Sequence, residues 1–142
     1  MIEKLIAAIS IALGLEFGEG YTKYKEYVTQ GVKEPCFFIT CVNPSVKAFP
    51  NSRYRNHFMF HIQYLPKDTL HPDEECYSVG ERLNSCLEVI SESGDLLRGT
   101  QMHFEVEGGA LNYFVSYDFF TNKIVDKADE LNEISMNITA KE

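Results

Sequence analysis

Apolar and polar residues recur along this chain with two different periods, and each period predicts a type of element. From Ile2 to Phe17 the apolar positions repeat every three or four residues, which is the period of an amphipathic helix. Gly18 and Gly20 follow and are expected to end that helix. From Phe58 to Tyr64 an apolar side chain occupies every second position, which is typical of a strand with one buried face.

Similar patterns predict four further strands. Their expected ranges are Tyr24–Thr29 at a sheet edge, Cys36–Val42, Gln101–Val106 and Ala110–Thr121. The segment Cys36–Val42 is apolar at consecutive positions, which indicates a central strand covered on both faces. Asn43-Pro44 is expected to end it, and Gly108-Gly109 is a hairpin turn signal between the last two strands.

A second helix is predicted to begin at Pro72, because proline fits a first helical turn and the acids after it suit the positive end of the helix dipole. Its buried stripe is expected to consist of Cys76, Val79, Gly80, Leu83, Leu87 and Ile90. Gly94 is placed just past its end. The polar segment Ser45–Asn56 is predicted to be a long loop, and loops of that length are often functional.

The expected order is therefore helix, three strands, helix, two strands. Consecutive strands favour an α+β fold with a mainly antiparallel sheet and helices packed on it. No repeat or change of composition divides the chain, so residues 1–125 are expected to form a single α+β domain. Residues 126–142 are a polar C-terminal tail, which we expect to be either a marginal helix or disordered.

Composition narrows the classes of partner. A net charge of −8 and a pI near 5.0 disfavour nucleic acid, and no apolar run is long enough to cross a membrane. Glu3 interrupts the basic start that a signal peptide needs, so we expect synthesis in the cytoplasm. The four cysteines contain no C-x-x-C pair, and free, mostly buried thiols in a reducing compartment are expected.

The histidines raise the question of a metal site. His57 and His61 would share one face of a helix, but the alternation around them predicts a strand, along which they would lie about 13 Å apart. Zinc–nitrogen bonds are about 2 Å, so the pair does not easily hold one ion. A spatial cluster of His57, His61, His103 and Asp118 would make a small enzyme, and this stays the least favoured hypothesis. We predict no catalytic residue, no metal and no cofactor.

The aromatic residues are the one feature of composition and pattern that points to a function. The chain has ten Phe and eight Tyr, and several of them fall on both faces of predicted strands. Examples are Phe37 with Phe38, and Phe120 with Phe119. Apolar side chains on both faces need cover from helices or from another subunit, which favours assembly over catalysis.

Seven short stretches resemble small tail-terminator-like proteins of phages and prophages of Gram-positive bacteria. They are KEPCFFI (33–39), NPS (43–45), RY (53–54), FHIQYLP (60–66), ERL (81–83), LLRGTQM (96–102) and YFVSYDFF (113–120). Each is weak alone, and their order and spacing carry the resemblance, which extends from Lys4 to about Val125.

The resemblance implies a structural protein of the virion tail, present in the bacterial host cytoplasm during assembly. It implies a homo-oligomeric ring, usually six-fold, that caps the tail tube, stops tube polymerisation and presents a surface to head–neck connector proteins. Such a protein can be monomeric in isolation. We take six residues as candidate interface positions: Arg53, Tyr54, Arg55, Arg98, Asp118 and Phe120.

An acidic export chaperone, which binds unfolded segments of secreted effectors, is the alternative. Such chaperones resemble this chain in size, charge and element order. They usually end in a solid amphipathic helix, whereas the apolar stripe after Asp126 is marginal here. A stable two-fold dimer in light scattering would favour the chaperone, and a monomer or six-fold ring would favour the terminator.

Overall fold

The computed structural model describes residues 1–26, 30–68 and 70–122, and within them one six-stranded sheet carries two helices. The elements in chain order are α1 (Ile2–Phe17), β1 (Thr22–Tyr24), β2 (Cys36–Phe49), β3 (Arg53–Leu65), α2 (Pro72–Cys86), β4 (Val89–Glu92), β5 (Asp95–Glu107) and β6 (Ala110–Asn122). The strand order is β1-β2-β3-β6-β5-β4, with only β1 parallel to its neighbour. The predicted α+β class is confirmed.

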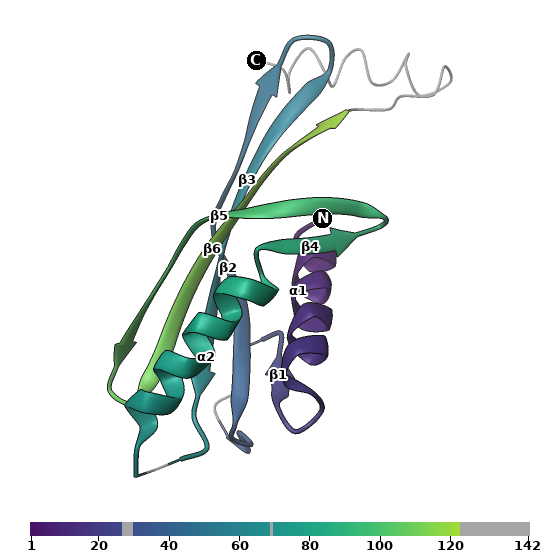
Figure 1. Ribbon diagram of the computed structural model, residues 1–142. Coiled ribbons are helices and arrows are strands. Elements are labelled where there is room, and N and C mark those ends of the chain that lie inside the picture. The colour runs from purple at the N-terminus through teal and green to yellow at the C-terminus, as the bar shows by residue number, and fades with distance from the viewer. Residues whose placement is uncertain (27–29, 69, 123–142) are drawn as a thin grey trace.

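Both helices lie on the same face of the sheet (Figure 1), and the core lies between the two layers. Leu5, Ile9 and Leu13 of α1 are fully buried there, as the period of three and four predicted. The alternate β3 residues Phe60 and Ile62 are fully buried in the same core. The opposite face of the sheet carries no helix among the described residues, and we call it the open face.

The predicted long loop Ser45–Asn56 is wrong, because these residues form a β-hairpin. Strand β2 continues through Asn43-Pro44 to Phe49, and β3 already begins at Arg53. The register shifts between Val42 and Ser45, and Asn43 has a φ of 49°. This bulge lets the strand pass a proline that has no N–H to donate.

The predicted end of the second helix is also wrong. Helix α2 ends at Cys86, and Ile90 lies in β4, a strand that the sequence pattern did not separate from the helix. Ser93 and Gly94 form the turn into β5, with φ of 53° and 86°. Three strands therefore follow α2 instead of two. Leu87 and Ile90 are nonetheless buried, because they face the same core as the helix stripe.

The predicted edge strand, Tyr24–Thr29, overlaps the observed edge strand only at Tyr24 within the described residues. β1 spans Thr22–Tyr24 and pairs with the start of β2 at one edge of the sheet. Lys25 and Glu26 lie outside it, and the rest of that prediction, residues 27–29, falls outside the described residues. The predicted tail, residues 126–142, falls outside them as well.

Four free thiols and several buried tyrosines make the stability of the fold sensitive to alkali. Burial raises the pKa of Cys36 and of Cys76 to about 11 and that of Cys86 to about 12. In the unfolded chain these thiols ionise near their ordinary value of 9.0, so unfolding releases protons at high pH.

We therefore expect the free energy of unfolding to be unaffected by these thiols below pH ~8 and to fall from about pH 9 upward. Urea titrations between about pH 7 and 11 would measure it. Replacing Cys86 with alanine should make the decline shallower, and a free energy that stays flat to about pH 10.5 would contradict the prediction.

Candidate interaction surface

The ends of three strands project beyond both helices as a narrow sheet (Figure 1). We call this segment, residues 45–57 and 118–122, the ribbon. Ser45 to Phe49 pair with Arg53 to His57, and Arg53 to His57 pair in turn with Asp118 to Asn122. Val46 is 58% exposed and Phe120 is 50% exposed, because neither helix covers this part of the sheet.

Aromatic rings and cations meet on the open face of the ribbon. Phe49 and Phe120 pack edge to face with ring centroids 5.4 Å apart. The Arg53 guanidinium lies 4.9 Å from the Phe120 centroid, and Lys47 Nζ lies 5.7 Å from that of Phe49. Such cation–π contacts keep the charges over the rings without neutralising them.

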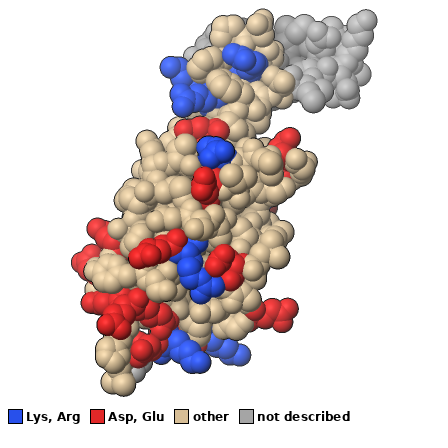
Figure 2. All heavy atoms as spheres, in the orientation of Figure 1, with Lys and Arg blue, Asp and Glu red and all other residues tan. Residues whose placement is uncertain are grey.

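The ribbon has the opposite sign of charge to the chain as a whole. It contains Lys47, Arg53 and Arg55 against one carboxylate, Asp118, whereas the whole chain has a net charge of −8. Figure 2 shows blue Lys and Arg side chains on the projecting end and most of the red Asp and Glu side chains over the body. A basic, aromatic projection is suited to bind an acidic partner surface.

Asp118 ties the base of the ribbon together. Its carboxylate is hydrogen-bonded to His57 Nδ1 and lies 3.6 Å from the Arg55 guanidinium. His57 and Asp118 are directly opposite each other on β3 and β6. On the open face Asp118 of β6 is thus linked to two residues of β3.

On the face of the ribbon opposite the open face, Asn56 links β3 to β6 through hydrogen bonds. Its side chain is buried, and Nδ2 donates to the Phe119 carbonyl at 3.4 Å and to Thr121 Oγ1 at 3.0 Å. These bonds join β3 to β6 within the ribbon, beside Phe119, which packs against Phe58. Side-chain hydrogen bonds therefore add to the strand ladder that holds the strands of the ribbon together.

The structure brings four of the six predicted interface residues together. Arg53, Arg55, Asp118 and Phe120 all lie on the open face of the ribbon. Tyr54 lies on the ribbon's other face, since it alternates with them along β3. Arg98 lies on β5, where it contacts Glu88 at 3.3 Å.

Sequence reasoning missed Lys47 and Phe49, which complete the cluster. The signal was present in the period-two alternation of SVKAF and RYRNH around the turn at Pro50. It was overlooked because Pro50 and Asn51 inside the segment suggested a loop.

The histidines of the enzyme hypothesis do not converge. His61 and His103 each stack on Phe114, with ring centroids 4.9 Å from it. His61 Nε2 is 2.8 Å from Asn112 Oδ1, and His57 is held by Asp118. Within the described parts of the chain no group of three or more His, Cys, Asp or Glu could hold a metal ion.

The aromatic surplus of the body is mostly covered within the chain. Phe38, on the open face, is buried and stacks on Tyr24 with centroids 5.1 Å apart. Phe114 is half-buried between its two histidines. Phe120 on the ribbon is 50% exposed and Tyr77 on α2 is 54% exposed, so these two aromatic side chains remain open to contact with a partner.

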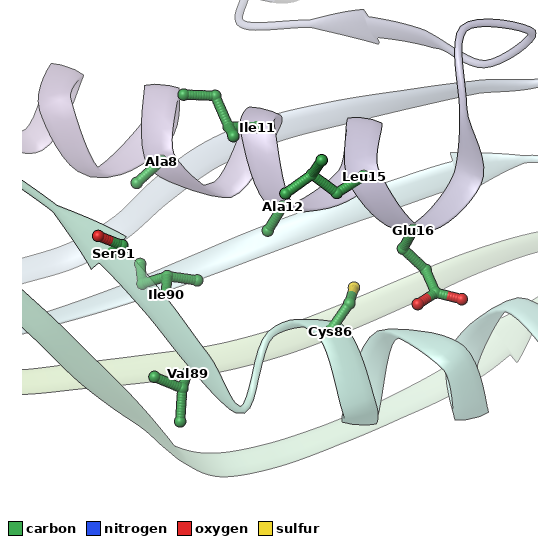
Figure 3. Close-up of a pocket in the computed structure, with 9 residues that line it drawn as sticks. All are labelled: Ala8, Ile11, Ala12, Leu15, Glu16, Cys86, Val89, Ile90 and Ser91. Atoms are coloured by element: carbon green, nitrogen blue, oxygen red, sulfur yellow. The ribbon is translucent and has the colours of Figure 1, made fainter.

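A second uncovered surface is an apolar groove between α1 and β4, with a volume of about 320 Å³. Figure 3 shows Ala8 and Ala12 on the side of α1 that faces Ile90, and Ile11 and Leu15 also line the groove. Leu15 is 86% exposed. The small alanine side chains leave the space between the two elements unfilled.

Neither described helix is long and apolar enough to cross a membrane. Residues 4–132 match a protein family described as phage tail terminator protein. No curated protein matches the sequence. One solved structure covers 89% of this chain and 99% of its own at 11% sequence identity, with a TM-score of 0.44, a likeness too weak to support any argument.

Proposed function

Since this chain belongs to the phage tail terminator family, we propose that it completes the tail by closing a ring on the tip of the tail tube. The match over residues 4–132 is the observation that carries this proposal. The ring, which we expect to be six-fold, would stop further polymerisation of the tube and present a surface to the head–neck connector proteins. The family is structural, and the proposal contains no catalytic step.

The geometry supports an assembly role in a specific way. In a ring each subunit has two different contact surfaces. The first surface of one copy contacts the second surface of the next copy, head to tail. The ribbon is a projecting surface with exposed cations and a half-exposed phenylalanine. The groove beside α1 is a further, apolar surface, which lies apart from the ribbon. Family membership also favours this function over the export chaperone, for which no feature of the described residues speaks specifically.

The proposal predicts the length of tails in the absence of the protein. In the phage or prophage that carries this gene, deletion is expected to give tubes of uncontrolled length that do not join heads. Electron microscopy of lysates would measure tube lengths, with the gene supplied in trans as the control. Tails of normal length would remove the assignment, and a two-fold dimer in light scattering together with effector binding would replace it with the chaperone.

A further inference from the structure

The basic ribbon leaves two of its cations without a carboxylate. Among the residues that the structure describes, Arg55 is the ribbon cation with an ion pair, and Lys47 and Arg53 only lie over aromatic rings. Both side chains are exposed. A surface that combines free cations with Phe49 and Phe120 is suited to a partner that offers carboxylates beside apolar or aromatic groups.

At the other end of the sheet, the open face has carboxylates beside an aromatic side chain. Glu105 and Glu107 are exposed on β5, opposite Asn112 and Ala110, and no ion pair involves them within the described residues. The half-buried Phe114 lies on the same face, opposite His103. The acidic first turn of α2 is next to this end, since Cys76 packs against the carbonyl of Gly109.

The two surfaces of one molecule cannot meet. Glu107 pairs with Ala110 at the start of β6, and Arg53 pairs with Asn122 at its end. The strand between them spans about 40 Å at ~3.3 Å per residue, several times the Debye length of about 8 Å at physiological salt. The opposite charges are therefore available to different copies of the chain.

We propose that the ribbon of one copy docks on the open face of the next copy, with Lys47 and Arg53 paired to Glu105 and Glu107. This inference rests on the proposed ring and names its contact. The contact is head to tail, so it can close into a ring by rotation. A two-fold contact between ribbons would instead place like charges together and is disfavoured.

Charge exchange tests the pairing. One variant carries Lys47→Glu with Arg53→Glu, a second carries Glu105→Lys with Glu107→Lys, and a third carries all four changes. Each gene is supplied in trans to a phage deleted for it, and titre and tube length are measured. We expect each pair of changes alone to lower the titre by about 100-fold or more, and the fourfold variant to recover to within about 10-fold of the unchanged chain.

Circular dichroism and thermal melting of the purified variants would establish folding. If the ribbon binds the tube instead, the fourfold variant will be as defective as the ribbon variant, and the pairing is overturned. The proposed function is tested separately, because the deletion itself still has to give overlong tubes.

A second measurement needs no variant. Treating isolated wild-type tails with a carbodiimide joins lysine amines to carboxylates in direct contact. Mass spectrometry is expected to find Lys47 joined to Glu105 or Glu107 of another copy, together with a ladder of multimers. Cross-links from Lys47 only to the tube protein would overturn the inference.

Discussion

Replacing Arg53 and Arg55 together with glutamate is expected to lower phage titre by about 100-fold or more while leaving the fold intact. Both side chains are on the exposed ribbon, outside the core. Truncating one partner of a buried charge pair at an interface typically costs about 2–5 kcal/mol, and every ~1.4 kcal/mol is a factor of ten in affinity. The change at Arg55 also replaces its contact with Asp118 by two like charges, whereas the hydrogen bond between Asp118 and His57 remains.

The control must make the same change in charge elsewhere. Lys4 on α1 and Lys25 after β1 are both exposed, and no ion pair involves them among the described residues. Lys4→Glu with Lys25→Glu therefore lowers the net charge equally without touching the ribbon. Its titre should stay within a few-fold of the unchanged chain. Normal titres from the ribbon variant would refute a role for the ribbon in tail completion.

The parts of the fold that sequence predicted well are those where one face is buried. Helix α1 was predicted with its observed bounds, because Leu5, Ile9 and Leu13 face a continuous core. Strand β3 was recognised from Phe58 onward for the same reason. Burial imposes a pattern on the residues, and that pattern can be detected in a single sequence.

The errors fall where that constraint is missing or ambiguous. Between Ser45 and Asn56 the ribbon has no core to face, so its few apolar side chains, such as Val46, stay exposed and the segment resembled a loop. At Leu87 and Ile90 the chain changes from helix to strand while both residues stay in one core. Their spacing fits either element, and the turn at Gly94 was taken for a helix end.

The candidate site shows the same division. Arg53 and Arg55 were chosen as a pair, and their alternation on β3 does place them on one face. Their contacts with Phe120 and Asp118 depend on the register of β3 against β6, which a single sequence does not specify. Lys47 enters the site through a hairpin that was not predicted. The exposed glutamates of β5 acquire a role only once the charge of the ribbon is known.

The second large effect that we expect is on the free energy of unfolding, and it concerns the loop that connects β3 to α2. The Glu75 carboxylate accepts a hydrogen bond from the fully buried Tyr64 hydroxyl. It also accepts from the backbone N–H groups of Lys67 and Asp68, at 2.8 and 2.9 Å. One side chain thus fixes the core tyrosine, the loop and the first turn of α2 in a single arrangement.

Glu75→Ala is expected to lower the free energy of unfolding by about 2–4 kcal/mol, because a hydrogen bond to a charged group contributes ~1.5–3 kcal/mol and the buried Tyr64 hydroxyl is left without an acceptor. Glu74→Ala is the matched control, since Glu74 is the exposed neighbour in the same helical turn. Both variants lose the same interaction with the helix dipole, so their difference isolates the Glu75 hydrogen bonds. Urea titrations near neutral pH would measure both, and equal free energies of unfolding for the two variants would show that Glu75 does not hold the loop.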